Sequence, residues 1–300
     1  MGKFICLDIG GTSIKYGVME EKEGFIDRGI IASEAENGAL HMLRKAEDII
    51  SKYAKGCMDG LCISTAGVVE PTTGIILHSN TNIPGYIGIN LKAYFYNKFG
   101  IPCEVENDVN CAGLAEAVSG AAAGRKIAFC MTVGTGIGGC LLMNGRVIHG
   151  SCNCAGEVGY MQLREGNLEP AGTVKSLVQN VIRGKGQSDE KWDGKKVLDY
   201  AGKGDTICLT ALEKMARILG MGIANICYCL NPEVVVLGGG IMSEEYESLI
   251  YPRIRKIMDE HLPPLIAKNT QLKMASHRNE AGMLGAYYHF LQMRGTKRLV

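Results

Sequence analysis

The sequence predicts an α/β fold with two similar lobes, each built on a mostly parallel sheet covered by helices. Three observations support this. Strand-like apolar runs alternate with helical patterns along the chain. The 40 glycines in 300 residues gather in clusters, and three clusters directly follow a β-rich run. A unit of strand, glycine turn and strand near the N-terminus also reappears in the second half of the chain.

The first half of the chain contains nine patterned segments. In order, we expect two strands around a glycine turn, a hairpin tip, an amphipathic helix, a buried strand, a loop-rich excursion, a helix, a strand and a helix capped by Asp108. These are residues 4–9, 13–19, 21–29, 37–56, 60–67, 71–90, 91–100, 102–107 and 109–120. The amphipathic helix is predicted from Leu40, Leu43, Ala46 and Ile50, which recur near helical spacing.

The second half opens on the repeated unit, with strands at 127–133 and 139–148 around the turn GTGIGG. Beyond it, one more strand is predicted at 233–237. Helices are expected at roughly 173–184, 194–201, 206–230, 243–260 and 280–293.

Composition narrows the functional classes. Lysine plus arginine (32) nearly balances aspartate plus glutamate (31), so no overall field would draw the chain to nucleic acid or to an anionic membrane. No apolar stretch approaches the roughly 18 residues of a membrane span, and the N-terminal run is too short for a signal peptide. We therefore expect a cytoplasmic protein without nucleic-acid or membrane partners, whose 12 cysteines remain thiols.

The first glycine turn lies beside an acidic residue. In DIGGTSIK, Asp8 reaches the edge of the predicted sheet, and Gly10, Gly11 and Thr12 form a turn whose N–H groups can approach an anion closely. A carboxylate beside such a turn suits Mg²⁺ bound to nucleotide phosphates. For this stretch alone, a plain β-hairpin with a Gly-Gly turn is an equal alternative.

The second glycine turn, VGTGIGG, offers phosphate oxygens the same open backbone. It is not a Walker A motif, because no GK[ST] ends it, and its spacing misses the GxGxxG pattern by one residue. Two such turns, each after a strand, favour a nucleotide held between two lobes. A third cluster, NPEVVVLGGGI, could let adenine lie against backbone, although a simple strand-to-helix connection explains it equally well.

The stretch EVENDVN places Asp108 at a strand-to-helix junction, where α/β sheets bind ligands. Asp108 can be an N-cap that stabilises the helix by about 1 kcal/mol. It can also be a general base that accepts the proton of a hydroxyl group attacking a γ-phosphoryl group. Asn107 has an amide able to fix a sugar hydroxyl, and these residues alone leave the two interpretations about even.

The stretch HGSCNCAGEVGYMQLREGNLEPAG at 149–172 raises the question of a metal site. His149, Cys152 and Cys154 are three soft ligands, but no fourth ligand is visible nearby. We interpret HGSCNC as a loop and leave the role of Cys152 and Cys154 open.

Six motifs in order resemble the ROK family (repressors, open reading frames, kinases) over essentially the whole chain. They are DIGGTSIKYGV, ISTAGVVEPTTG, VENDVNCAGLAE, VGTGIGGCLLMNGRVIHG, AGEVGY and NPEVVVLGGGI. The resemblance implies the duplicated actin-like (ribonuclease H-like) ATPase fold, with two lobes around a nucleotide and sugar cleft. It also implies ATP-dependent phosphorylation of a hexose, usually at the 6-hydroxyl, with Mg²⁺.

The resemblance also implies domain bounds and an assembly. The smaller N-terminal lobe would span residues 1–117, with a C-terminal helix at about 284–300 packing back on it, and the larger lobe would span 118–283. Family members are commonly dimers or tetramers, so we expect a homodimer.

The matched motifs assign roles to individual residues. Asp108 is implied as the catalytic base. The sugar would be bound by Gly67, Asn107, Asp108, Glu157, Tyr160 and Glu169. The nucleotide would be bound by Asp8, Gly10, Gly11, Thr12, Lys15, Gly134, Thr135, Gly136, Gly238 and Gly239, with Asp8 supporting Mg²⁺ through phosphates or water.

The family name also covers repressors, which carry a DNA-binding module ahead of the first glycine loop. That loop begins here at residue 8, so we expect an enzyme and keep a non-catalytic sugar-sensing regulator as the rival. An acetate-kinase or chaperone-type ATPase on the same fold is less favoured, because Asn107-Asp108 and AGE-x-G suit a polyhydroxyl acceptor.

One departure from the family pattern bears on the acceptor. Typical members follow AGE-x-G with a histidine and a CxCGxxGCxE loop that together hold a structural zinc. Here Tyr160 stands at the histidine position, and MQLREGNL contains no cysteine before Glu169, so we expect no structural zinc. The pattern resembles β-glucoside kinases and some N-acetylmannosamine kinases. Among glucose, a β-glucoside and N-acetylmannosamine, a roomier pocket would suit a disaccharide.

Overall fold

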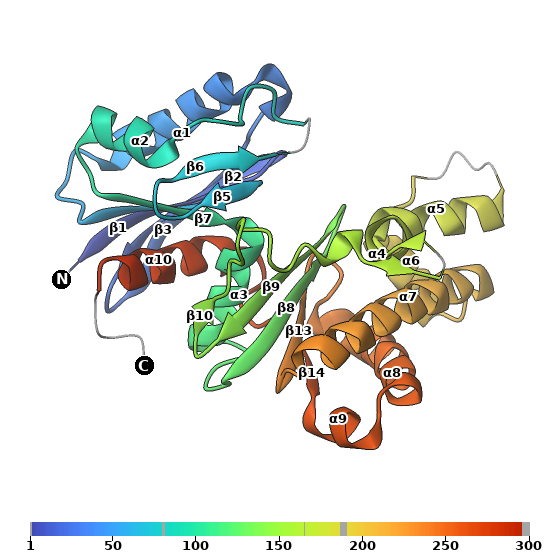
Figure 1. Cartoon of the computed structure of the whole chain (residues 1–300). Helices are drawn as coiled ribbons and strands as arrows, with labels where there is room; N and C mark the ends of the chain where they lie inside the picture. Colours follow the sequence, from blue (N-terminus) through green and yellow to red (C-terminus); the bar gives the residue numbers. More distant parts are fainter. Residues whose placement is uncertain (1, 80–81, 165, 187–190, 296–300) are drawn as a thin grey trace. The chain divides into compact units, whose positions relative to one another are not determined.

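The computed structural model describes residues 2–79, 82–164, 166–186 and 191–295 (Figure 1). The chain divides into two compact units, which are considered one at a time. The N-terminal unit comprises Met1–Val118, Gly150–Cys154 and Asn279–Val300, and the C-terminal unit comprises Ser119–His149 and Ala155–Arg278.

The N-terminal unit is built on a five-stranded sheet with the order β3-β2-β1-β4-β7. Its strands are β1 (Lys3–Ile9), β2 (Ser13–Glu20), β3 (Gly24–Ala32), β4 (Gly60–Thr65) and β7 (Cys103–Asn107). The pairs β1–β2 and β2–β3 are antiparallel, whereas β1–β4 and β4–β7 are parallel. The carboxyl ends of β1, β4 and β7 therefore meet at one edge of the sheet.

The C-terminal unit repeats this sheet with the order β10-β9-β8-β13-β14. Its strands are β8 (Ile127–Val133), β9 (Ile137–Met143), β10 (Arg146–Val147), β13 (Val234–Gly238) and β14 (Gln271–Met274). Again two pairs are antiparallel and two are parallel. The predicted repeat is confirmed, but the sheets are mixed rather than mostly parallel. A short glycine turn joining consecutive strands permits only an antiparallel pair.

Helices cover both faces of the N-terminal sheet (Figure 1). Helices α1 (Ala39–Tyr53) and α2 (Leu91–Phe99) lie on one face, where Leu43, Ile50 and Phe95 are fully buried. Helix α10 (Ala281–Met293) lies on the other face, in contact with β1, β4 and β7. Phe290 packs edge-on against Phe4 of β1 with ring centroids 5.4 Å apart. Helix α3 (Asp108–Ser119) follows β7 directly.

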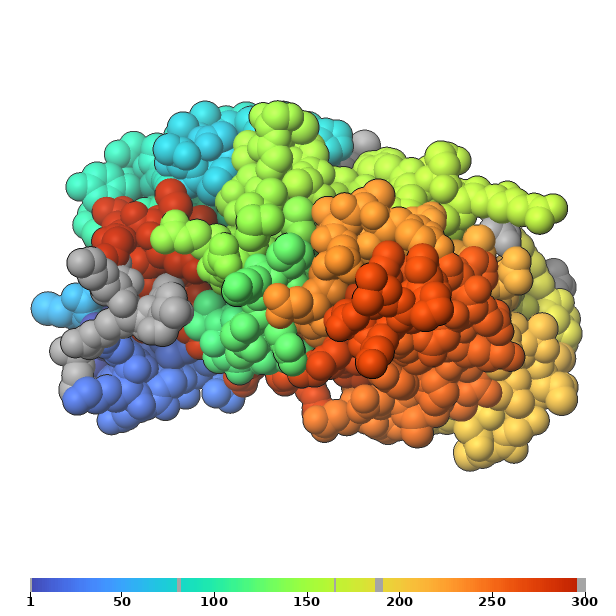
Figure 2. Space-filling view, turned by 60° about the horizontal axis from the view of Figure 1, so that its bottom comes forward, coloured from blue at the N-terminus to red at the C-terminus, as the bar shows by residue number. Residues whose placement is uncertain are grey.

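The C-terminal sheet is covered by helices whose apolar faces share one core with β8 and β13. These helices are α4 (Leu168–Gly172), α5 (Val174–Lys185), α6 (Gly194–Gly202), α7 (Thr206–Leu230), α8 (Glu244–His261) and α9 (Pro264–Asn269). The long helix α7 packs against α8, and residues of both helices, drawn in orange, form a continuous part of the surface in Figure 2.

Two small hairpins lie in segments that the sequence indicates as loops. Strands β5 (Val68–Glu70) and β6 (Ile75–His78) pair within the excursion after β4, and β11 (Gln162–Leu163) pairs with β12 (Gly166–Asn167). Of residues 21–29, interpreted as a hairpin tip, only 21–23 form the turn, and the rest belong to the edge strand β3. These strands are short or exposed, so they carry little of the apolar alternation that predicts a strand. Over the residues that the structure describes, no helix has the length and apolarity to cross a membrane.

Candidate active site

The carboxylate of Asp8 is held at the end of β1 by both neighbouring strands. Ser64 of β4 donates a hydrogen bond to Asp8 Oδ1 at 2.7 Å, and Lys15 Nζ of β2 lies 3.4 Å from Asp8 Oδ2. These contacts follow from sheet register, because Asp8 is the pairing partner of both Ser64 and Lys15. The carboxylate is thereby oriented beside the glycine turn that follows β1.

That turn is closed by a hydrogen bond from the Gly10 amide to the Ser13 carbonyl at 2.9 Å. A Cβ atom at Gly11 would meet no atom within 4 Å, so the fold itself does not require glycine there. A bare backbone with open space around it is what a phosphate needs for close approach. Gly10, Gly11, Thr12, Lys15 and Asp8 are thus gathered at one edge of the N-terminal sheet, as an anion site with a metal-binding carboxylate requires.

Helix α10 contributes a contact that the sequence did not predict. A Cβ atom at Gly282 would lie 2.6 Å from the carboxyl carbon of Asp8. Only glycine therefore lets the first turn of α10 approach Asp8 closely. The positive end of the helix macrodipole favours a carboxylate at this position.

Asn107 and Asp108 lie where β7 passes into α3, and they share one hydrogen-bond network. Asn107 Nδ2 donates to the Gly67 carbonyl and to Asp108 Oδ1, both at 2.9 Å. Asn107 Oδ1 accepts from the amides of Val109 (2.9 Å) and Asn110 (3.0 Å). Asn107 therefore caps the helix, whereas Asp108 was expected to be the N-cap. Asp108 is the first helical residue and accepts a second hydrogen bond, from Val109 N, at 2.9 Å.

The surroundings of Asp108 make it a weaker acid. Burial, and after it the negative charge of Asp8, raise the pKa of Asp108 from 3.8 to about 7. The hydrogen bonds from Val109 and Asn107 lower this pKa but do not cancel the rise. A carboxylate whose pKa lies near neutrality is matched to proton transfer at physiological pH. Asp108 therefore has the electrostatics of a general base.

Tyr86 lies beneath this network and was not predicted as a site residue. Its hydroxyl group is 2.6 Å from Thr65 Oγ1, and Thr65 pairs with Asn107 across the β4–β7 ladder. Burial raises the pKa of Tyr86 well above its usual range, and the charge of Asp108 adds to this. Tyr86 therefore stays protonated, and its hydroxyl group contacts Thr65, the strand partner of Asn107. The excursion 71–90 gave no periodic signal that could have indicated this role.

Gly67 is needed as glycine on two grounds. Its φ is +99°, and a Cβ atom would lie 2.7 Å from the His78 carbonyl. Because the Gly67 carbonyl accepts the Asn107 amide, this tight conformation places the start of β5 directly against the Asn107-Asp108 pair.

In the C-terminal unit, the turn between β8 and β9 is closed by Gly134 N donating to the Gly136 carbonyl at 2.9 Å. Glu169 lies against this turn: its Oε2 accepts the Ile137 amide at 2.9 Å and would be 2.8 Å from a Cβ atom at Gly136. In the structure, Glu169 holds the glycine turn, and its predicted role as a sugar ligand stays a prediction.

The AGEVGY segment packs on the same strand. A Cβ atom at Gly156, whose φ is +95°, would lie 2.2 Å from the Gly139 carbonyl, and one at Gly159 would lie 2.7 Å from the Ile137 carbonyl. The glycines fix this segment on β9, while Glu157 and Tyr160 beside them are exposed. Tyr160 is 71% exposed, so its ring is available to a ligand.

The third glycine cluster adjoins the turn after β8. Gly238 pairs with Thr132, two residues before Gly134. Gly239 has φ +120°, and a Cβ atom there would lie 2.1 Å from the Val133 carbonyl. Gly134, Thr135, Gly136, Gly238 and Gly239 therefore lie at one edge of the C-terminal sheet. Whether this edge and the Asp8–Asp108 edge face one cleft stays a prediction.

Cys152 and Cys154 lie in an exposed turn, where Cys154 Sγ is 3.3 Å from the Cys152 carbonyl. Within the described ranges, no three histidine, cysteine or acidic side chains are grouped so that they could hold a metal ion. A role for the two cysteines does not emerge from their contacts.

Known proteins similar to this chain match nearly all of it. An uncharacterised protein of Clostridium perfringens (strain 13 / Type A) is 43% identical over 291 residues, covering 97% of this chain and 98% of the relative. A beta-glucoside kinase of Listeria innocua serovar 6a is 30% identical over 304 residues, covering 97% and 98%.

Solved structures show the same fold. A ROK family protein from Streptococcus pneumoniae TIGR4 in complex with sucrose has a TM-score of 0.84 at 27% identity, covering 98% of this chain and 99% of that one. A ROK family glucokinase from Streptomyces griseus in complex with glucose and AMPPNP has a TM-score of 0.80 at 25% identity, covering 95% and 98%. The predicted duplicated actin-like α/β fold is confirmed. Since the model of the ROK family matches residues 4–293, this chain belongs to the ROK family.

Proposed function

We propose that the protein is an ATP-dependent sugar kinase that phosphorylates a hexose or hexose derivative at its 6-hydroxyl, with Asp108 as the general base. The observation that carries the proposal is the state of Asp108: Asn107 and Val109 orient its Oδ1, and its pKa is raised to about 7. The beta-glucoside kinase relative and the glucokinase bound to glucose and AMPPNP support the same reaction class.

In the proposed reaction, the acceptor hydroxyl oxygen attacks the γ-phosphorus of ATP. The bond from that phosphorus to the β,γ-bridging oxygen breaks, ADP leaves, and the hydroxyl proton passes to Asp108. Both amide hydrogens of Asn107 are donated, to Gly67 and to Asp108, so its first task would be to orient the base. Asn107 would bind a neighbouring sugar hydroxyl by exchanging one of these hydrogen bonds for the sugar. Orientation of this kind can lower the barrier by roughly 7 to 11 kcal/mol.

The phosphates would lie against the two glycine turns, Gly10–Thr12 and Gly134–Gly136. Mg²⁺ would be held near Asp8, whose carboxylate is oriented by Ser64 and Lys15, and when bound it would neutralise charge on the phosphate oxygens. Adenine would lie along Gly238 and Gly239. Glu157, Tyr160 and Glu169 would contact the sugar on the side of its anomeric carbon.

For the acceptor, we propose a β-glucoside in preference to glucose or N-acetylmannosamine. At the position of the family's zinc loop, this chain has the short hairpin β11–β12, in which Gln162 Nε2 donates to Asn167 Oδ1 at 2.5 Å. Next to it the exposed ring of Tyr160 could stack on a second sugar. The relatives named beta-glucoside kinase and the sucrose-bound structure are consistent with a two-ring ligand.

An ADP-release assay tests both the proposed kinase reaction and the proposed acceptor. Purified protein with ATP and Mg²⁺ should release ADP in the presence of at least one of glucose, cellobiose, N-acetylglucosamine and N-acetylmannosamine. We expect cellobiose to give the highest kcat/KM. Efficient use of glucose with no turnover of cellobiose or N-acetylmannosamine would refute the wider pocket, and sugar binding without any ADP release would favour the rival regulator.

A further inference from the structure

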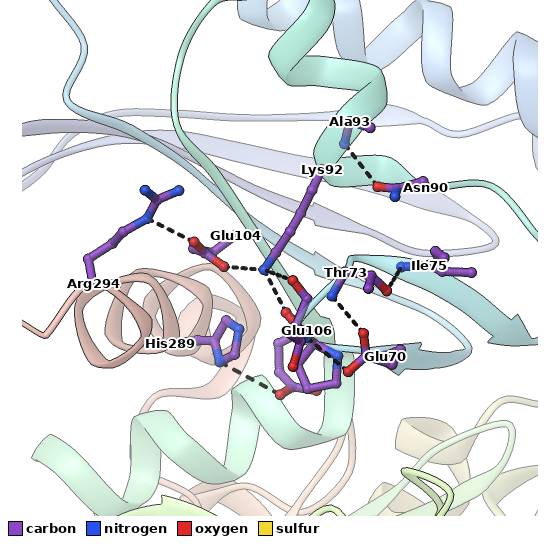
Figure 3. Close-up of polar contacts among 12 residues, drawn as sticks. Glu70, Thr73, Ile75, Asn90, Lys92, Ala93, Glu104, Glu106, His289 and Arg294 are labelled. Atoms are coloured by element: carbon purple, nitrogen blue, oxygen red, sulfur yellow. Dashed lines mark hydrogen bonds and ion pairs between the residues drawn. The ribbon is translucent and has the colours of Figure 1, made fainter.

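Strand β7 carries two buried carboxylates immediately before the Asn107-Asp108 pair. Glu104 is 5% exposed and Glu106 is fully buried, and residues two apart on a strand point to the same side of the sheet. Figure 3 shows that both side chains reach toward α10: Arg294 Nε donates to Glu104 Oε1 at 2.8 Å, and His289 Nδ1 is 3.7 Å from Glu106 Oε2.

Glu104 has a second cationic partner on α2. Lys92 Nζ lies 2.5 Å from Glu104 Oε2, and the Lys92 side chain is only 16% exposed. Lysine in the first turn of a helix opposes the helix macrodipole. Because Lys92 is partly buried at this unfavourable position, its contacts must compensate for the cost.

The same ammonium group binds the turn of the β5–β6 hairpin. Lys92 Nζ donates to the Pro71 carbonyl at 2.6 Å and to the Thr72 carbonyl at 2.9 Å. The stem of Lys92 also lies across Gly74, where a Cβ atom would be 2.5 Å from Lys92 Cγ. Lys92 thus joins the hairpin turn to β7.

The turn is also ordered from within. Glu70 accepts the amides of Thr72 (3.1 Å) and Thr73 (2.6 Å). The Thr73 side chain, and after it these amides, lower the pKa of Glu70 to about 2, although burial opposes the shift. Because these hydrogen bonds make the turn rigid, a contact that fixes the turn also fixes the two short strands β5 and β6. The other end of the hairpin carries Gly67, whose carbonyl receives the Asn107 amide.

We propose that Lys92 is a positioning residue for the acceptor site. By joining Glu104 to the carbonyls of Pro71 and Thr72, it fixes the β5–β6 hairpin at its turn, so that Gly67 at the opposite end stays against Asn107. Backbone hydrogen bonds also join this hairpin to residues 88–91, from Leu91 N to the Gly74 carbonyl and from Ile76 N to the Ile89 carbonyl. Lys92 adds the link from the turn to β7, the strand that carries Asn107. The inference rests on the proposed function, since the site it positions is the proposed acceptor site.

The chain contains a matched control on the same helix. Lys98 of α2 also pairs with a buried glutamate, Glu47 of α1, but this pair has no contact with the hairpin or β7 among the interactions described. Lys92→Met and Lys98→Met each remove one ammonium group from α2 and leave one buried carboxylate with less compensation. Loss of thermal stability is expected in both.

The test compares Michaelis constants for the best acceptor of the wild-type protein. Lys92→Met should raise the acceptor KM roughly tenfold, the equivalent of losing one charge-assisted hydrogen bond, while the KM for ATP changes less than about twofold. Lys98→Met should leave both KM values unchanged. An acceptor KM in Lys92→Met equal to that in Lys98→Met would overturn the inference.

A double variant separates positioning from loss of stability. Lys92→Met/Glu104→Gln removes the ammonium group together with the negative charge it compensates, and the glutamine oxygen can still accept from Arg294 Nε, so the thermal midpoint should recover while the acceptor KM stays raised. If the KM recovered with the midpoint, Lys92 would be merely structural and the inference wrong. The proposed function is tested separately, on the wild-type protein: it fails if that protein transfers phosphate to no sugar in the ADP-release assay.

Discussion

The negative charge of Asp8 adds to the effect of burial on Asp108, and together they raise the pKa of Asp108 to about 7. The two carboxylates lie at the ends of β1 and β7 in the same sheet but have different partners. Asp8 is paired with Lys15 and Ser64, whereas Asp108 is bound by an amide side chain and a backbone amide. These surroundings suit different proposed roles: Asp8 would support a metal ion, and Asp108 would accept a proton.

Replacing Asp108 tests its role as the base. Asp108→Asn keeps the shape of the side chain and an oxygen for the Asn107 and Val109 hydrogen bonds, but it removes the proton acceptor. We expect kcat to fall by about 10²- to 10⁴-fold, the usual contribution of a general base. Sugar affinity, measured by calorimetry, should stay within a few-fold of wild type. Substantial residual turnover would refute the assignment.

The pH dependence of activity should report the same group. A base works only when deprotonated, so kcat/KM should fall as the pH is lowered through the pKa of Asp108, which burial holds above 3.8 even where Mg²⁺ offsets the charge of Asp8. An ordinary aspartate would keep its activity down to about pH 4. The measurement is kcat/KM for the acceptor at saturating Mg²⁺ and ATP from acid to mildly alkaline pH, and an acid limb near 4 would contradict the raised pKa.

Stability should show the opposite trend. Because the folded pKa of Asp108 lies above its unfolded value of 3.8, the folded state binds the proton more tightly. This stabilisation is present below the unfolded pKa and is lost as the pH rises through about 7. Asp108→Asn should therefore raise the thermal midpoint relative to wild type more at about pH 8 than at about pH 4. An equal effect at both pH values would mean that burial does not destabilise the ionised carboxylate.

Gly11→Ala separates the needs of the ligand from those of the fold. A Cβ atom there meets nothing within 4 Å, so the thermal midpoint should match wild type. In the proposed complex that methyl group would crowd the phosphates, and the KM for ATP should rise roughly tenfold. Gly202→Ala at the end of α6, also without a neighbour within 4 Å, is the control. An unchanged KM for ATP would place the phosphates elsewhere.

Much of this site could be predicted because it depends on local sequence. Asp8 and the Asn107-Asp108 pair each lie where a strand ends, and the carboxyl ends of parallel strands meet at one edge. Asp108 was nevertheless expected to be the helix N-cap. The structure gives that role to Asn107, and local sequence could not separate two neighbouring cap-forming residues.

The partners that tune the site could not be predicted, because they are distant in sequence. Ser64 meets Asp8 through strand register, and Gly282 meets it through the packing of α10. Tyr86 and the β5–β6 hairpin lie in a segment rich in glycine, threonine and asparagine, where strands of three and four residues leave no period. Such contacts are set by tertiary packing rather than by a pattern along the chain.

Gly239 offers the sharpest test of the third glycine cluster, because its neighbour Gly240 is a matched control. At Gly239 the φ of +120° is strained for any other residue, and a Cβ atom would lie 2.1 Å from the Val133 carbonyl. Gly239→Ala should lower the free energy of unfolding by about 1 to 3 kcal/mol. It should also raise the KM for ATP, because Val133 immediately precedes the Gly134 turn.

At Gly240 a Cβ atom meets nothing within 4 Å, so Gly240→Ala should keep the wild-type thermal midpoint. Equal midpoints for the two variants would show that the backbone at Gly239 relaxes without cost.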